Sequence, residues 1–177
     1  MSREFDRTII NNLFITNLNQ SLKLKNDTIR SVKLEVYPTK DIIDRHVNGS
    51  LTVIWRDWDK IIESMPKMVY VSSVNPGEIK GPHLHTKRDS YFVCIHGKVV
   101  FIAKDLTGKY HEIESSEDNP ILVQIPKNHP SAHINLSEGI STVLGLANPA
   151  WRPNDNEMKD VVFSDYDWEK WKTVVKR

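Results

Sequence analysis

Two histidines one residue apart, His83 and His85, lie in a segment that is bounded by Gly77 and Gly97. On a β-strand, side chains alternate between the two faces, so both imidazoles would point to the same side. Imidazole is the commonest metal ligand in proteins, and its unperturbed pKa of about 6.5 lets it transfer protons near neutral pH. The pair therefore predicts a chemical site in a β-rich cavity, which either moves protons or binds a metal ion.

The elements that would position this site are mainly short strands. Seven runs rich in β-branched and aromatic residues recur between turn signals, at residues 32–37, 51–55, 68–71, 91–95, 99–103, 121–125 and 142–147. Many short strands separated by Gly, Asn and Pro turns are typical of a sandwich or barrel. Helix is expected at residues 164–177, where Ser164 is a candidate N-cap, and over the shorter segment 57–64.

The composition bounds the size and the class of the protein. With 177 residues, 39% of them hydrophobic, the chain can bury one sizeable core, and we expect one domain. Twenty-four Lys and Arg balance 23 Asp and Glu, which argues against a nucleic-acid partner. The first residues are charged and no apolar run approaches the roughly 18 residues of a membrane span, so we expect a cytoplasmic protein without a membrane partner. The single cysteine, Cys94, lies in an apolar run and is expected to be a buried thiol.

Two segments resemble the paired motifs of the cupins. The first motif is represented, with similar spacing, by Gly77, His83, His85, Ser90 and Gly97. Ser90 stands where the metal-binding cupins have glutamate. Residues 125–133 resemble the second motif, a proline turn that leads to a histidine, here His133, although Asn128 replaces the usual glycine. The resemblance implies an all-β fold, the double-stranded antiparallel β-helix or cupin jelly roll, with a short C-terminal helix.

A narrower resemblance covers roughly residues 40–170. The segments 48–51 and 80–85 and the chain end are similar to those of RmlC-like sugar-nucleotide cupins. These are the dTDP-4-dehydrorhamnose 3,5-epimerases and the dTDP-4-keto-6-deoxyglucose 3,4-ketoisomerases. The implied single domain, 1–177, would comprise an N-terminal arm and strand at 1–40, a jelly-roll core at 41–163 and a helix at 164–177.

This resemblance also implies an activity and partners. We expect an epimerase or isomerase that acts on a nucleotide-diphosphate sugar, dTDP-linked, without a cofactor, in deoxysugar or surface-polysaccharide biosynthesis. A homodimer is expected as well, in which the segment 32–37 pairs across the subunits.

The catalytic residues follow from the chemistry and the resemblance together. Epimerisation next to a ketone needs a base on one face of the sugar, a proton donor on the other and a positive charge near the enolate oxygen. Ketoisomerisation needs proton transfer along one face only. His83 matches the epimerase base, whereas the pair with His85 matches the ketoisomerases. The epimerases' acid tyrosine has no counterpart near residues 147–151, so Tyr91, or else Tyr70, would have to donate the proton.

A carboxylate that orients the base would come from the C-terminal part of the chain, where Asp167 is the candidate by resemblance. Lys80 occupies the place of a family arginine near the substrate, and Ser90 that of a family lysine or glutamine. The full set of candidate substrate-binding residues is Lys80, Arg56, Arg88, Ser90, His133 and Trp151. Arginine would meet a diphosphate through charge-assisted hydrogen bonds, and tryptophan would stack on a nucleotide base.

Two other classes of function compete with the sugar-nucleotide enzyme. In the first, His83, His85 and His133 bind a divalent metal ion, which three imidazoles would suit. In the second, the chain is a non-catalytic sugar-binding cupin, in keeping with the missing tyrosine. The hypothesis without a metal site is preferred, because the glutamate of the metal-binding motif is absent.

Overall fold

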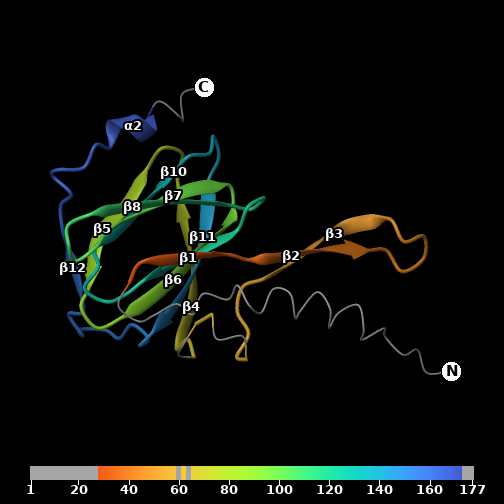
Figure 1. Ribbon diagram of the computed structural model, residues 1–177, viewed down its shortest axis with the longest axis horizontal. Coiled ribbons are helices and arrows are strands. Elements are labelled where there is room, and N and C mark those ends of the chain that lie inside the picture. Colours follow the sequence, from red (N-terminus) through yellow and green to blue (C-terminus); the bar gives the residue numbers. More distant parts are fainter. Residues whose placement is uncertain (1–27, 59–60, 63–64, 173–177) are drawn as a thin grey trace.

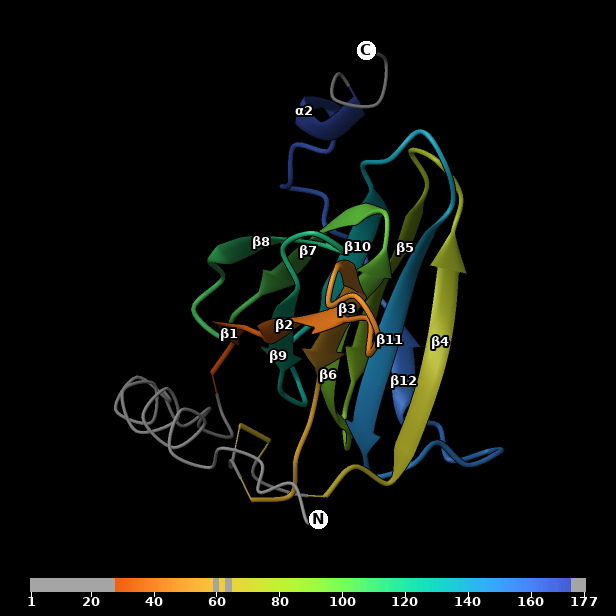
Figure 2. The same cartoon turned by 90° about the vertical axis from the view of Figure 1, so that its right-hand side faces the viewer.

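The computed structural model describes residues 28–58, 61–62 and 65–172. Within these ranges, the strands form two five-stranded antiparallel sheets and one separate hairpin (Figure 1). The two sheets face each other (Figure 2). Apolar side chains from both sheets pack together in part of the space between them. This is the arrangement of a jelly roll, so the predicted all-β cupin fold is confirmed.

The first sheet, called the β4 sheet here, has the strand order β1-β9-β6-β11-β4. Its strands are β1 (Arg30–Lys33), β4 (Met68–Val74), β6 (Asp89–His96), β9 (Ile121–Ile125) and β11 (Ser141–Asn148). The second, called the β5 sheet, has the order β12-β5-β10-β7-β8. Its strands are β5 (Ile79–His85), β7 (Lys98–Lys104), β8 (Tyr110–Ser116), β10 (Ser131–Asn135) and β12 (Met158–Asp160).

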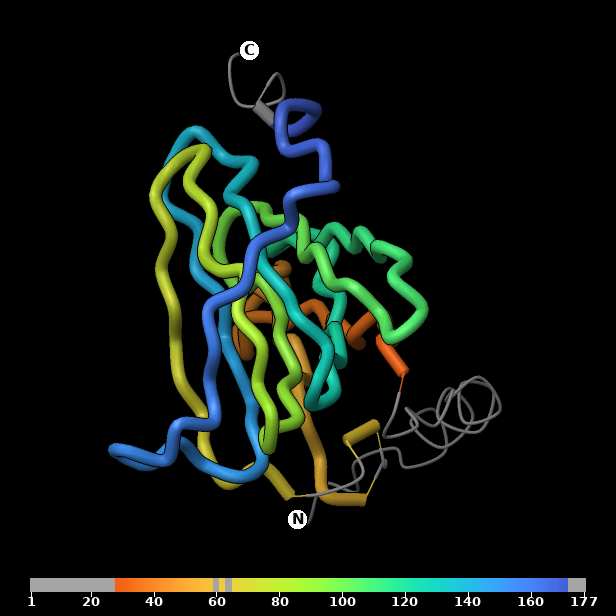
Figure 3. Tube along the Cα trace, turned by 90° about the vertical axis from the view of Figure 1, so that its left-hand side faces the viewer, coloured from red at the N-terminus to blue at the C-terminus, as the bar shows by residue number. Residues whose placement is uncertain are grey.

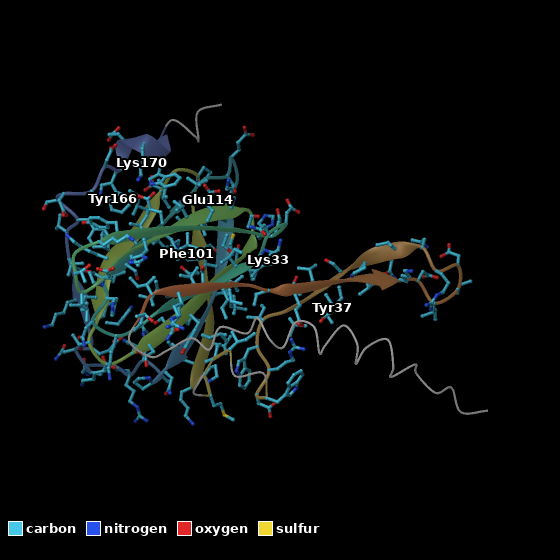
Figure 4. All side chains as sticks on the ribbon, in the orientation of Figure 1. Lys33, Tyr37, Phe101, Glu114, Tyr166 and Lys170 are labelled. Carbon is cyan, nitrogen blue, oxygen red and sulfur yellow. The ribbon has the colours of Figure 1, made fainter. Side chains whose placement is uncertain are left out.

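The hairpin consists of β2 (Glu35–Lys40) and β3 (Val47–Val53), and it projects from the body of the molecule (Figure 1). Tyr37 lies on this projection, whereas Phe101 lies between the two sheets (Figure 4). The predicted strand 32–37 is divided at Leu34, whose side chain is buried in a hydrophobic cluster with Leu122 on the outer face of the β4 sheet. Its two halves are hydrogen-bonded within the chain, β1 to β9 and β2 to β3, and the expected pairing across subunits stays a prediction.

The inner faces of the two sheets form the core. Val99, Phe101 and Ala103 of β7 pack there against residues of the β4 sheet such as Val123 and Val143. The alternate residues of β7 are buried too, because the C-terminal segment covers the outer face of the β5 sheet. The sequence of β7 is therefore a nearly continuous apolar run, as expected of a strand that is covered on both faces.

The C-terminal segment runs beside β5 as β12 and then crosses the outer face of the β5 sheet towards the helix α2 (Glu169–Lys172) (Figure 3). Phe163 and Tyr166 are buried there against Val100 and Ile102 of β7. The predicted C-terminal helix exists, but in the described part of 164–177 it begins only at Glu169. The aromatic residues before it are held in a non-helical path by their packing against the sheet.

Each of the seven predicted runs overlaps a strand, and the His83–His85 pair does lie on one. Strands β5, β8, β10 and β12 are missing from the seven runs. Strand β5 was indicated only by its histidine pair, and the other three are short or mostly polar. In the predicted helix 57–64, the described residues form bends, and residues 59–60 and 63–64 lie outside the described ranges. None of the helical structure in the described part of the chain has the length or apolar character of a membrane-spanning segment.

Candidate active site

A cavity of about 650 Å³ lies between the β4 and β5 sheets. The β4 sheet contributes Met68, Tyr70 and Ser72, which are alternate residues of β4, and the facing wall contains the two histidines of β5. A volume of this size suits a small-molecule ligand. The cavity is therefore the candidate active site.

The two histidines reach the cavity because of the local shape of β5. His83 and His85 are alternate residues of this strand and both line the cavity, as their spacing predicted. Just before them, Gly81 has a φ of +91°, and a Cβ atom there would lie 2.7 Å from the backbone oxygen of Ser131. Only glycine allows this close approach of β5 to β10.

His83 is paired with a carboxylate from the neighbouring strand. Its Nδ1 lies 2.9 Å from Oδ1 of Asp160, which stands directly opposite it in the antiparallel register of β12 and β5. A carboxylate acceptor makes Nδ1 the protonated nitrogen and leaves the lone pair on Nε2. The exposed fraction is 40% for the His83 side chain and 88% for that of Asp160, so this pair is open to solvent.

The partner of His83 was predicted to be Asp167, and this is corrected by the structure. Asp167 lies at the start of α2, where its Oδ1 accepts a hydrogen bond of 3.0 Å from the backbone N–H of Glu169. The preceding aromatic residues, including Phe163 and Tyr166, bury themselves on the outer face of the β5 sheet. Their packing keeps Asp167 on the side of the sheet that faces away from the cavity.

His85 belongs to a buried group of charges. Its Nδ1 lies 3.0 Å and 3.1 Å from the two carboxylate oxygens of Glu157, and a terminal nitrogen of Arg88 lies 2.8 Å from its Nε2. The same Arg88 nitrogen is 3.4 Å from Glu157. Burial lowers the pKa of His85, and the charge of Arg88 lowers it further. Both effects favour the neutral form of His85, while Glu157 opposes them.

The third cavity histidine, His133, is also neutral. Burial, with smaller contributions from Lys80 and His83, lowers its pKa to about 4. Its Nε2 is buried and has no hydrogen-bond partner among the described residues. The ring packs against Phe101, with 5.7 Å between the ring centres. A polar atom left unpaired in a cavity wall is available to a ligand.

Two further residues of the wall can donate hydrogen bonds. Nζ of Lys80 donates to Oγ of Ser72 over 2.9 Å, which joins the two sheets at one side of the cavity. Tyr70 lines the same cavity, and burial raises the pKa of its hydroxyl. The Tyr70 ring lies flat against Gly145, where a Cβ atom would be 2.6 Å from its Cζ.

Of the other predicted residues, Trp151 lines the cavity and is largely exposed, but three lie elsewhere. Tyr91, 1% exposed, is on the opposite face of β6 and packs against Leu122 in a second hydrophobic cluster, on the outer face of the β4 sheet. Arg56 pairs with Glu35 at 2.5 Å, outside the cavity. Ser90 is buried but does not line the cavity. Tyr91 cannot donate a proton to a ligand there, because strand alternation turns it away.

The arrangement of the histidines also bears on the metal hypothesis. The ligand atoms of His83, His85 and His133 do not come together as one group; among the described residues, only Asp41, Asp44 and His46 of the hairpin do. Nδ1 of each histidine on β5 is already engaged by a carboxylate. The geometry therefore fits proton transfer better than metal binding.

Sequence reasoning missed Asp160 and Glu157. Both are acidic residues in the segment just before the C-terminal aromatic cluster, and they are three positions apart. This spacing is the one feature of the sequence that could have indicated two carboxylates paired with the two histidines.

Two antiparallel sheets around a histidine-lined cavity define this protein as a cupin. The family described as "FdtA: WxcM-like, C-terminal" matches residues 32–166, so the chain belongs to this family.

Similar proteins agree with this assignment. SpsL of Bacillus subtilis (strain 168), a spore coat polysaccharide biosynthesis protein, is 27% identical over 126 residues, which are 66% of this chain and 81% of that protein. A dTDP sugar isomerase from Desulfovibrio desulfuricans G20 has a similar structure, with a TM-score of 0.69 and 16% identity; the match covers 81% of this chain and 92% of that one.

QdtA, a sugar 3,4-ketoisomerase from Thermoanaerobacterium thermosaccharolyticum in complex with TDP, gives a TM-score of 0.60 and 20% identity, covering 86% of this chain and 96% of that one. The capsular polysaccharide assembling protein CapF from Staphylococcus aureus gives a TM-score of 0.52 and 23% identity, and the match covers 55% of this chain. This chain spans only 27% of CapF. These structures share the fold of the present chain.

Proposed function

We propose that this protein is an isomerase of a nucleotide-linked 4-keto-6-deoxy sugar, which moves protons next to the ketone with histidine as the base. The observation that carries the proposal is the pair of His83 and Asp160 in the cavity wall, 2.9 Å apart. The carboxylate fixes the imidazole tautomer and stabilises the imidazolium that forms. Nε2 of His83 is then the nitrogen that accepts the substrate proton.

The chemical step follows from the acidity of a C–H bond beside a carbonyl. Nε2 of His83 takes the proton from this carbon, the C–H electron pair becomes the new C=C bond, and the carbonyl π pair moves onto oxygen. The resulting enolate is then protonated again at carbon. Return of the proton from the opposite face inverts the carbon, which is epimerisation.

Tyr70 supports epimerisation as the first choice. It belongs to β4, whereas His83 belongs to β5, so the two line the cavity from facing sheets. A sugar bound between the sheets would have the base on one side and a phenol on the other. The hydroxyl of Tyr70, whose pKa is raised by burial, keeps its proton until the enolate accepts it.

A second candidate is 3,4-ketoisomerisation. In that reaction the proton leaves C3 and returns to C4 on one face, while the hydroxyl proton moves from O3 to O4. The neutral His85 next to His83 favours it, since two imidazoles on one side of the cavity suit a one-face shuttle. The likeness to QdtA, a sugar 3,4-ketoisomerase, supports it as well.

The nature of the substrate is supported by the relatives. The dTDP sugar isomerase and the TDP complex of QdtA suggest a dTDP-linked sugar for this chain, with its diphosphate near Lys80 and its base near Trp151. The likeness to SpsL suggests a role in polysaccharide biosynthesis. We further propose a single cupin domain that acts as a homodimer.

The test is proton exchange with solvent. The protein is incubated with dTDP-4-keto-6-deoxyglucose in deuterated water, and NMR locates the incorporated deuterium. Label at C3 and C5 with a retained 4-ketone indicates double epimerisation, and label with a ketone moved to C3 indicates ketoisomerisation. A substrate that stays unlabelled, while it binds to the folded protein, would refute the proposed function.

A further inference from the structure

Arg88 is a buried cation in the wall of the cavity. Its side chain is only 8% exposed, yet the residue lines the cavity together with the histidines of β5. Its Nε is buried and has no hydrogen-bond partner among the described residues. A guanidinium remains charged at any physiological pH, so the cavity contains a permanent, partly unsatisfied positive charge.

Two residues hold this guanidinium in place. Glu157, 2% exposed, lies 3.4 Å from a terminal nitrogen of Arg88 and provides the counter-charge. The same nitrogen lies 2.8 Å from Nε2 and 3.0 Å from Nδ1 of His85, so it rests against the imidazole ring, while Nδ1 also faces Glu157. Glu157 and the His85 ring together therefore fix the position of this nitrogen. The three side chains form a closed group whose spare donors belong to the guanidinium alone.

The two cations that line the cavity differ in their surroundings. Lys80 already donates to Ser72 and its bond is exposed to solvent. Arg88 lies in a drier part of the wall, near Tyr70, whose burial-raised pKa it opposes. A charge acts more strongly on a nearby reacting oxygen where water is excluded. Lys80 thus suits a solvated diphosphate, and Arg88 suits an oxygen that becomes negative only during the reaction.

We propose that Arg88, held by Glu157 and His85, donates hydrogen bonds to the keto oxygen of the sugar and stabilises the enolate. This assignment rests on the proposed function. It gives His85 a positioning role, because its ring is in contact with Arg88 and Glu157, and it leaves His83 as the base. The positive charge that enolate formation requires then comes from a residue that the sequence indicated only as a partner for the diphosphate.

The experiment compares Arg88→Gln and Arg88→Lys with the wild type in two measurements. One is the rate of deuterium exchange into saturating dTDP-4-keto-6-deoxyglucose, and the other is the Kd of dTDP, which has the diphosphate but no sugar. Loss of one donor to an oxyanion lowers kcat by about 10²- to 10³-fold, which we expect for Arg88→Gln. The Kd of dTDP should stay within about twofold of the wild type, since the diphosphate is bound elsewhere.

The variant Arg88→Lys distinguishes a catalytic effect from misfolding. It keeps a cation against the buried Glu157 but loses the planar fork, so its exchange rate should fall between those of Arg88→Gln and the wild type. Arg30→Lys, the same change on β1 and outside the cavity, is the matched control and should exchange at the wild-type rate.

The outcomes separate this inference from the proposed function. Exchange at the wild-type rate in both folded Arg88 variants overturns the role of Arg88 alone. A loss of dTDP affinity that matches the loss of rate also overturns it, because Arg88 would then bind the diphosphate. If the wild-type protein exchanges no protons, the proposed function falls and the role of Arg88 falls with it.

Discussion

Replacement of His83 by asparagine should abolish catalysis and leave the fold intact. The side chains of His83 and Asp160 are 40% and 88% exposed, so their pair contributes at most about 1 kcal/mol to stability. Asparagine keeps a hydrogen-bonding side chain of similar reach but accepts no proton at neutral pH. Removal of a general base lowers the rate by about 10²- to 10⁴-fold, which corresponds to roughly 3–5 kcal/mol of activation free energy. The loss of rate should therefore far exceed the loss of stability.

The assay is deuterium exchange into the bound 4-keto sugar, measured beside the urea midpoint and the Kd of dTDP. Asp160→Asn should slow the exchange by about 10- to 100-fold, as expected of a group that orients a catalytic side chain. Asp167→Asn is the matched change at the other candidate carboxylate. It should weaken the cap of α2 by about 1 kcal/mol and leave the exchange rate unaltered. Exchange at the wild-type rate in folded His83→Asn protein would refute the assignment of the base.

Three further predictions concern the cavity wall, pH and assembly. Gly145→Ala places a methyl group 2.6 Å from Cζ of Tyr70, so the ring must shift. We expect the free energy of urea unfolding to fall by about 1–3 kcal/mol and the deuterium exchange to slow. Gly139→Ala, with open space around it, should change neither stability nor exchange rate. Because burial lowers the pKa of His133 to about 4, the unfolded chain binds more protons than the folded chain between pH 6.5 and 4. The free energy of unfolding should therefore fall by about 1.4 kcal/mol for each unit by which the pH is lowered through this window. Urea midpoints at several pH values check this, and the slope should be smaller in His133→Asn; an equal slope would contradict it. Sedimentation at micromolar concentration should show a dimer, since the projecting hairpin exposes Tyr37 and Leu51, and a monomer would contradict this expectation.

The cavity shows how far local sequence patterns reach. The strand period of two places His83 and His85 on one face whatever the rest of the fold does, and this prediction is confirmed. The same alternation turns Tyr91 to the face of β6 opposite Phe92, but which of these two faces lines the cavity is set by the packing of the two sheets. The sequence therefore favoured Tyr91 over Tyr70, and the packing of the sheets reversed that order.

The sequence by itself determined the β class, the motif spacing of a cupin and the shared face of the two histidines, because these depend on neighbours along the chain. The tertiary structure decided which carboxylate meets which imidazole. Glu157 and Asp160 lie 72 and 77 residues beyond their histidines, and they meet them because β12 pairs with β5 in one antiparallel register. That register places Asp160 opposite His83, while burial of the C-terminal aromatic side chains carries Asp167 to the other side of the sheet. Pairing over such distances is set by packing energies that no local pattern contains.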